Sequence, residues 1–145
     1  MLKKSIVIDA PISLVWQHLT CPKLMTAWMP GIRAMRSADG GKARLGGILV
    51  FTVRAGERES EIIAFDPGRA FALRAIDGAF TTLYRYELAP APDGIEVSLH
   101  ATCTARGLAL LAGPLVRSFM RKADRWQLAY LKGEVEKARD LEARG

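Results

Sequence analysis

Turn signals recur at regular intervals between residues 46 and 104 of this sequence. They are Gly56-Glu57, Asp66-Pro67-Gly68, Asp77-Gly78 and the Pro- and Gly-containing stretch 90–94, and short apolar-rich stretches separate them. Glycine adopts the positive φ angles that tight turns need, and Asp-Gly suits the twist of a hairpin. Because such short turns join antiparallel neighbours, this region is predicted to form five consecutive antiparallel strands, preceded by a candidate strand at residues 32–37.

The turns also predict which side chains share a face of the sheet, since side chains alternate along a strand. Two-residue turns pair Phe51 with Ile62, Ala64 with Phe71, Ile62 with Leu73, and Phe71 with Tyr84. The predicted inner face is apolar with a few hydroxyls: Leu49, Phe51, Val53, Ser60, Ile62, Ala64, Phe71, Leu73, Ala75, Phe80, Thr82, Tyr84, Tyr86, Leu88, Ile95, Val97, Leu99, Ala101 and Cys103. We expect no charged side chain there. The predicted outer face carries Arg54, Glu59, Glu61 and Arg74, which we interpret as solvated cross-strand ion pairs.

The C-terminal part of the chain is predicted to cover the inner face. After Pro114 the sequence runs to Glu142 with Gly133 as its one glycine and with no proline. One helix over this stretch would be about 43 Å long, enough to cross a sheet. An apolar stripe at helical spacing consists of Val116, Phe119, Ala123, Trp126 and Tyr130, and the opposite surface carries Arg117, Arg121, Lys122, Arg125 and Lys132.

The N-terminal part of the chain contains sequence motifs that resemble those of a known superfamily. Residues 3–9 are predicted as a strand, and Pro11 and Pro22 open two short helices, because proline suits a first helical turn. Residues 7–16 (VIDAPISLVW), 22–31 (PKLMTAWMPG) and 65–69 (FDPGR), together with the order of elements, resemble the START-like superfamily of polyketide cyclase/dehydrase and lipid transport proteins. The resemblance implies one α+β domain over residues 1–145. Its helix-grip fold has a curved antiparallel sheet of six to seven strands, two short helices after the first strand, and a long C-terminal helix across the concave face.

Members of this superfamily enclose a cavity between the sheet and the C-terminal helix, and they bind lipids, sterols, polyketides or other hydrophobic small molecules. The resemblance therefore implies such a ligand here, in line with pockets that are mostly apolar with a few polar groups. The candidate lining residues are Trp28, Phe51, Val53, Ser60, Ile62, Phe71, Leu73, Thr82, Tyr84, Tyr86, Leu99, Phe119, Trp126 and Tyr130. The alternative is that these side chains only fill a core. Trp28 either gates the cavity or anchors its short helix on the sheet.

Two further function classes stay open. A polyketide cyclase/dehydrase-type enzyme would need a proton donor at the cavity wall, for which Tyr84 or Tyr86 is the candidate. Because the sequence has no Gly-x-Ser-x-Gly motif and the predicted inner face has no acid or histidine, we favour binding over catalysis. A membrane-surface or lipid-transfer protein would use the basic side of the C-terminal helix. The net charge of +6 alone does not indicate nucleic-acid binding, since no helix-turn-helix or aromatic-basic strip accompanies it.

Each of the two cysteines follows a histidine by three residues, His18 before Cys21 and His100 before Cys103. On a strand, an odd separation directs His100 and Cys103 to opposite faces, so we expect neither a metal site nor a cofactor. Two cysteines without a disulfide framework and an apolar stretch at the start too short for a signal peptide lead us to expect a cytoplasmic protein. The pattern specifies no oligomeric state.

Overall fold

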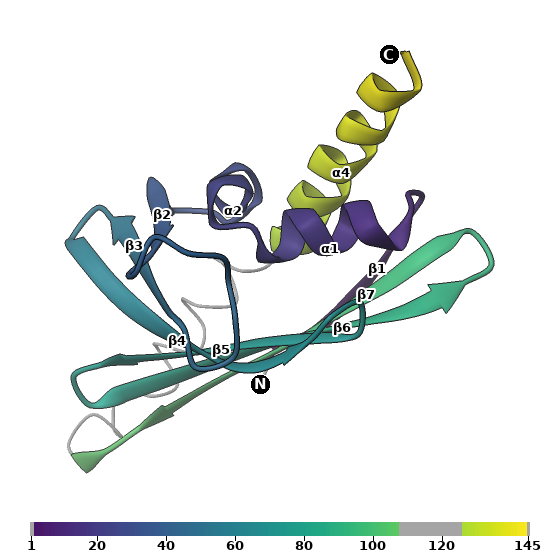
Figure 1. Cartoon of the computed structure of the whole chain (residues 1–145). Helices are drawn as coiled ribbons and strands as arrows, with labels where there is room; N and C mark the ends of the chain where they lie inside the picture. The colour runs from purple at the N-terminus through teal and green to yellow at the C-terminus, as the bar shows by residue number, and fades with distance from the viewer. Residues whose placement is uncertain (1, 108–125, 145) are drawn as a thin grey trace.

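The computed structural model describes residues 2–107 and 126–144. Its main layer is a seven-stranded antiparallel sheet in the order β1-β7-β6-β5-β4-β3-β2. The strands are β1 (Leu2–Ile8), β2 (Ala34–Ser37), β3 (Ile48–Val53), β4 (Gly56–Asp66), β5 (Ala70–Asp77), β6 (Phe80–Ala91) and β7 (Gly94–Ala105). The described helices are α1 (Ile12–Thr20), α2 (Pro22–Trp28) and α4 (Gln127–Arg144), and all three lie on the same side of the sheet (Figure 1). The predicted strand, pair of short helices, five-stranded meander and C-terminal helix are therefore confirmed.

The turn-based assignment of faces is largely confirmed, although three turns differ from the prediction. The β4–β5 connection spans three residues, Pro67 to Arg69, instead of two, because Asp66 pairs with Ala70. Strands β3 and β4 are joined through Arg54-Ala55, so Phe51 lies opposite Arg58 instead of Ile62. Gly56 then occupies the last position of the turn, where glycine is favoured. Strands β5 and β6 are joined through Gly78-Ala79, with Gly78 at φ +61°, so Phe71 lies opposite Tyr86. The shifts in the β3–β4 and β5–β6 turns move partners by an even number of residues, which leaves the side chains of these strand pairs on their predicted faces.

One face assignment is wrong, because β4 contains a bulge. The pairing of β4 with β5 shifts between Ile62 and Ala64. An extra residue in one strand reverses the alternation that follows it. Phe65 therefore lies opposite Phe71 on the inner face, and Ala64 lies opposite Ala72 on the outer face.

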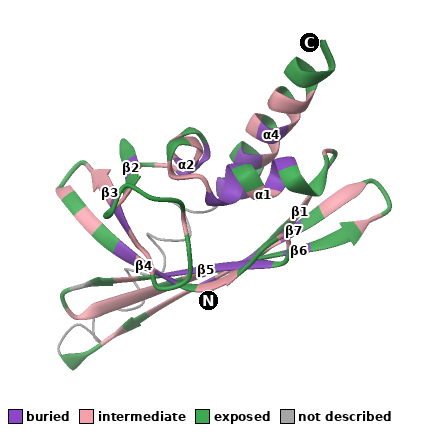
Figure 2. Ribbon diagram, viewed as in Figure 1, coloured by how far each residue is buried: buried purple, intermediate pink, exposed green. Residues whose placement is uncertain are grey.

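The core lies where the helices meet the sheet, and Figure 2 shows the buried residues gathered there. Leu14, Val15 and Leu19 of α1 and Met25 and Trp28 of α2 belong to the same buried cluster as Ile8, Phe71, Tyr86, Val97 and Leu99 of the sheet. The helix α4 contributes Leu128, Leu131 and Val135. It packs against α1, α2 and β1, while its last turns extend beyond the sheet (Figure 1).

The predicted apolar stripe of the C-terminal helix has the wrong phase. Trp126 and Tyr130 are 53% and 51% exposed, whereas Leu128, Leu131 and Val135 are buried. The prediction took its phase from aromatic residues of which Phe119, with the rest of the stripe up to Ala123, lies outside the described residues. Leu128, Leu131 and Val135 follow the same three- and four-residue spacing and form the row that meets the core.

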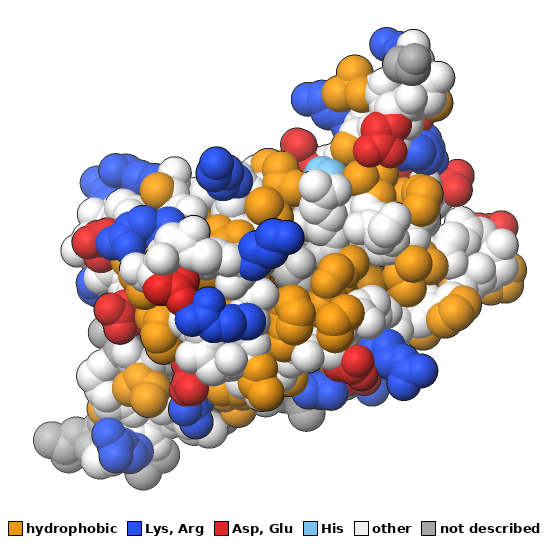
Figure 3. Space-filling model, in the orientation of Figure 1, with side chains coloured by type: hydrophobic (Ala, Val, Ile, Leu, Met, Phe, Trp, Pro, Cys, Tyr) orange, Lys and Arg blue, Asp and Glu red, His pale blue; other side chains and the backbone are white. Residues whose placement is uncertain are grey.

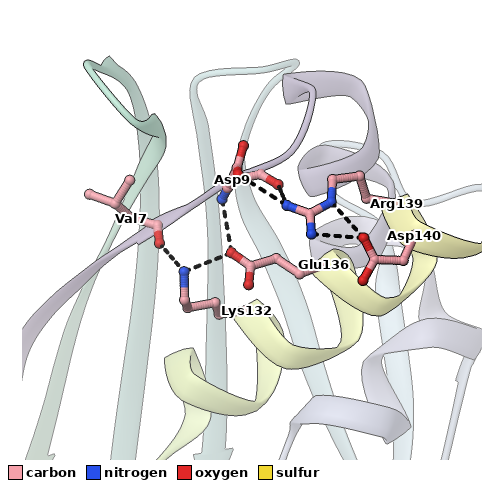
Figure 4. Close-up of polar contacts among 6 residues, drawn as sticks. All are labelled: Val7, Asp9, Lys132, Glu136, Arg139 and Asp140. Carbon is pink, nitrogen blue, oxygen red and sulfur yellow. Dashed lines mark hydrogen bonds and ion pairs between the residues drawn. The ribbon is translucent and has the colours of Figure 1, made fainter. Parts of the chain in front are cut away.

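A set of polar contacts fixes α4 to the end of β1 (Figure 4). Lys132 donates to the carbonyl of Val7 at 2.8 Å and pairs with Glu136 at 2.7 Å, and the Glu136 carboxylate also accepts the N–H of Asp9 at 3.0 Å. Arg139 donates to the Asp9 carbonyl at 2.6 Å. Burial alone would raise the pKa of Glu136, but the hydrogen bonds from Lys132 and Asp9 and the nearby positive charges hold it below its usual value.

Candidate functional site

The concave face of the sheet has a filled half and a hollow half. In the filled half, Tyr86 and Phe71 are fully buried and their rings stack with centroids 6.3 Å apart. Trp28 meets Tyr86 edge to face at 5.8 Å. The Trp28 indole N–H also donates to the carbonyl of His18 at 2.8 Å, an arrangement that ties α2 to α1. These contacts make Trp28 an anchor in the core.

The hollow half contains a cavity of about 400 Å³. It lies at the β3 side of the sheet, between the strands and the segment that follows α2. The described residues that line it are Met29, Pro30, Ile32, Met35, Phe51, Val53, Ala55, Arg58, Glu59, Ser60, Leu73, Ala75, Ile76, Thr82, Tyr84, Tyr86 and Gln127. Most of these side chains are apolar, and the volume lies within the range of small-molecule sites.

The structure brings half of the sequence-predicted site residues together at this cavity: Phe51, Val53, Ser60, Leu73, Thr82, Tyr84 and Tyr86. Ile62, Phe71 and Leu99 lie in the filled half, each at most 1% exposed. Trp28 lies in the core, Trp126 and Tyr130 are half exposed on or beside α4, and Phe119 lies outside the described residues. The sequence reasoning missed Met29, Pro30, Ile32 and Gln127, which come from segments whose position strand alternation does not specify, and Met35, which lies opposite Phe51 on β2.

Ser60 is the polar side chain of the cavity with an unmet hydrogen bond. It is 4% exposed, and its Oγ has no hydrogen-bond partner in the structure as described. Its cross-strand neighbours are Leu49 on β3 and Ala75 on β5, neither of which has a polar side chain. A buried hydroxyl without a partner costs about 1–3 kcal/mol, so Ser60 is an unusual polar group in this apolar wall.

Arg58 contradicts the expectation of a charge-free inner face. It lies opposite Phe51, two residues before Ser60 on β4, and it is half-buried at the cavity. One of its guanidinium N–H groups donates to the Glu57 carbonyl at 2.9 Å. The sequence contained the signal, because alternation from Ser60 places Arg58 on the same face.

The tyrosines differ in what their hydroxyls do. Tyr86 is fully buried, and its hydroxyl donates to the side-chain carbonyl of Gln127 at the start of α4. This bond joins the middle of the sheet to the C-terminal helix. Tyr84 lies further along β6 on the cavity wall, between Leu73 and Ala101. Arg58, Glu59 and these two tyrosines are the ionisable side chains among the described lining residues.

A wider groove of about 1180 Å³ lies on the other side of α1 and α2. Trp16 and Phe65 form its aromatic part, with ring centroids 5.4 Å apart, and the segment 36–43 forms its rim. Figure 3 shows hydrophobic side chains over the middle of this face, below α1, and Lys and Arg side chains gathered around β2 and β3. Trp16 and Phe65 are the aromatic residues among the described lining of this groove, and none of the predicted site residues belongs to that described lining.

Neither a metal cluster nor a membrane-spanning helix is found in the part of the chain that the structure describes. No group of three His, Cys, Asp or Glu side chains gathers within residues 2–107 and 126–144. His100 and Cys103 lie on opposite faces of β7, and Cys21 lies at the junction of α1 and α2. Among the described helices none is long and apolar enough to cross a membrane.

A family model described as polyketide cyclase/dehydrase and lipid transport matches residues 2–136. The chain belongs to this family. The START-like resemblance and the helix-grip fold predicted from the sequence are thereby confirmed. No curated protein matches the sequence.

Solved structures of similar fold share little sequence with this family member. Ara h 8.0201 superposes with a TM-score of 0.74 at 14% identity, over 94% of this chain and 97% of its own. The di-domain ARO/CYC protein StfQ from the steffimycin biosynthetic pathway gives 0.74 at 11% identity, over 96% of this chain and 51% of its own. Protein MLL2253 from Mesorhizobium loti gives 0.69 at 16% identity, over 94% and 96%. At such identities the likeness establishes the fold.

Proposed function

We propose that this protein binds a hydrophobic small molecule, a lipid, polyketide or aromatic metabolite, in the cavity of the concave face. The observation that carries the proposal is the cavity of about 400 Å³ whose wall consists mainly of apolar side chains from β3, β5 and β6. A well-packed core leaves few voids larger than a water molecule, so a space of this size against the concave face supports a ligand-binding role. Membership of a polyketide cyclase/dehydrase and lipid transport family supports the same class of ligand.

Binding is favoured over catalysis on the chemistry of the wall. A general acid works best with a partner that tunes or restores its proton. The hydroxyl of Tyr86 donates to Gln127, an amide that does not titrate. The enzymatic alternative is a cyclase-type reaction with Tyr84 or Tyr86 as the proton donor. The similar fold of the ARO/CYC protein StfQ is the reason to consider it.

A membrane-surface role has less support from the described part of α4. Residues 127–144 contain four basic and four acidic side chains, so this part of the helix has no net charge. Lys132, which the sequence analysis assigned to the basic surface, is engaged by Val7 and Glu136. Both cysteines are free, which fits a reducing compartment, and a cytoplasmic location is part of the proposal.

A pair of matched substitutions tests the cavity. Ala75 lines it and Leu83 lies on the outer face, more than a third exposed. Ala75→Phe places a ring in the cavity, whereas Leu83→Phe places one on the opposite face. We expect purified protein to bind the neutral hydrophobic dye Nile red and to gain thermal stability with hydrophobic compounds, because a ligand that binds only the folded state stabilises it. The proposal predicts that Ala75→Phe abolishes both effects and Leu83→Phe keeps them; a folded Ala75→Phe protein that binds like the wild type contradicts it.

A further inference from the structure

The apolar wall indicates that the ligand is hydrophobic, and two polar side chains of the same wall indicate which polar group the ligand carries. Ser60 contributes a hydroxyl that is buried, lines the cavity and lacks a hydrogen-bond partner in the structure as described. A serine hydroxyl both donates and accepts, so on its own it is satisfied by many polar groups. The neighbouring side chain narrows the choice.

Arg58 is that neighbour. Alternate residues of a strand share a face and lie about 7 Å apart, so Arg58 and Ser60 both face the cavity from β4. Glu59, between them, alternates to the outer face and is exposed, although it also borders the cavity at its edge. A guanidinium is always charged and carries five N–H donors and no acceptor, so Arg58 can hold several acceptors at once, the Glu57 carbonyl among them. The positive charge of Arg58 therefore lies on the same strand and face as the Ser60 hydroxyl, which has no hydrogen-bond partner in the structure as described.

We propose that the ligand is a hydrophobic carboxylic acid, held by its carboxylate between Ser60 and Arg58. This inference rests on the proposed function, since it concerns the same cavity. Arg58 can only donate, so the group that meets both side chains must accept from Arg58, and a group that also accepts from the Ser60 hydroxyl satisfies both donors. A carboxylate does so with two oxygens and adds opposite charge, and its pairing with a guanidinium is geometrically specific. The apolar body of the acid then lies against Phe51, Val53 and Leu73.

The test uses compounds that share a body and differ in the head group. The probes are 2-naphthoic acid and decanoic acid, each compared with its methyl ester, and binding is measured by displacement of Nile red and by calorimetry near neutral pH. We expect each acid to bind at least about 10-fold more tightly than its ester, the ratio of one charge-assisted hydrogen bond. Arg58→Gln is expected to remove this preference and Ser60→Ala to reduce it several-fold, with the affinity for the ester unchanged. Arg54→Gln, in the exposed β3–β4 turn, is the matched control and keeps the preference.

The possible results separate the two proposals. If acids and esters displace the dye equally well, the carboxylate inference is overturned and hydrophobic binding stands. The inference is also overturned if the acids bind more tightly but Arg58→Gln and Ser60→Ala keep that preference. If Nile red, acids and esters all fail to bind, hydrophobic binding and the carboxylate inference fall together.

Discussion

Replacing Ser60 with alanine tests whether the cavity wall contains a polar group that the protein alone leaves unsatisfied. Most substitutions of a buried residue destabilise a protein. Ser60→Ala is expected to do the opposite in the ligand-free protein. The Oγ atom is buried and has no hydrogen-bond partner in the structure as described, so its removal deletes a desolvation cost and breaks no hydrogen bond.

The size of the effect follows from two opposing contributions. A buried polar group without a partner costs about 1–3 kcal/mol. Deleting one atom forfeits a few dispersion contacts, each about 0.1–0.2 kcal/mol. Because Ser60 borders a cavity, part of its surface has no such contacts to lose. The free energy of unfolding should therefore rise by about 1 kcal/mol, which raises the Tm by about 3 °C for a chain of this size.

The assay is urea and thermal unfolding of protein stripped of bound lipid. Thr20→Val is the matched control, because it also removes a buried hydroxyl but one that donates to the Trp16 carbonyl at 2.8 Å. The control should lose about 1 kcal/mol. If Ser60→Ala lost as much as Thr20→Val, the hydroxyl would have a partner in the free protein, and the argument from an unsatisfied donor would be refuted.

Three further predictions concern the helix α4. Tyr86→Phe should lower the free energy of unfolding by about 1 kcal/mol in urea titrations, because it removes the buried hydrogen bond to Gln127. Leu131→Ala should cost about 3 kcal/mol and Tyr130→Ala less than about 1 kcal/mol, since only the former is buried; equal losses would contradict the observed phase of the helix. The lowered pKa of Glu136 means that its carboxylate stabilises the fold above the ordinary carboxylate pKa, and this stabilisation is lost as the pH falls through the lowered value. The Glu136→Gln protein should therefore be less stable than the wild type near neutral pH, and its stability should depend less on acid in unfolding titrations. Parallel pH profiles of stability for the two proteins would contradict this.

Alternation and turn chemistry predicted the faces of the sheet well, because the errors in the β3–β4 and β5–β6 turns happened to be even. The one-residue error in the β4–β5 turn is offset by the bulge, so that Ile62 still lies opposite Leu73 as predicted. Moving the β3–β4 turn from Gly56-Glu57 to Arg54-Ala55 changed the partner of Phe51 from Ile62 to Arg58 but left each on the inner face. A bulge is different, because one inserted residue reverses the alternation. Nothing in the sequence around Ile63 distinguishes a bulge from a regular strand. The pattern therefore could not predict that Phe65, and not Ala64, lies on the inner face.

The buried side of α4 was predicted wrongly for a related reason. Around Trp126 the sequence offers two apolar rows, one through Trp126 and Tyr130 and one through Leu128, Leu131 and Val135. Helical periodicity alone describes both equally well. The core selected the second row, in which aliphatic side chains fit against β1 and the short helices. Periodicity identified the helix, and tertiary packing decided which of its sides is buried.

The division of the concave face into a filled and a hollow half has no counterpart in the strand sequences. Along β6, Tyr86 and Leu88 lie in the core, with Tyr86 also at the edge of the cavity, while Tyr84 and Thr82 line the cavity, although all four obey one alternation. What differs is the cover. Residues of α1, α2 and α4 fill the space above the first pair, and among the described helical residues only Gln127 reaches the cavity wall. Strand alternation therefore does not determine which part of the concave face is filled; among the described residues, the packing of the helices above the sheet does.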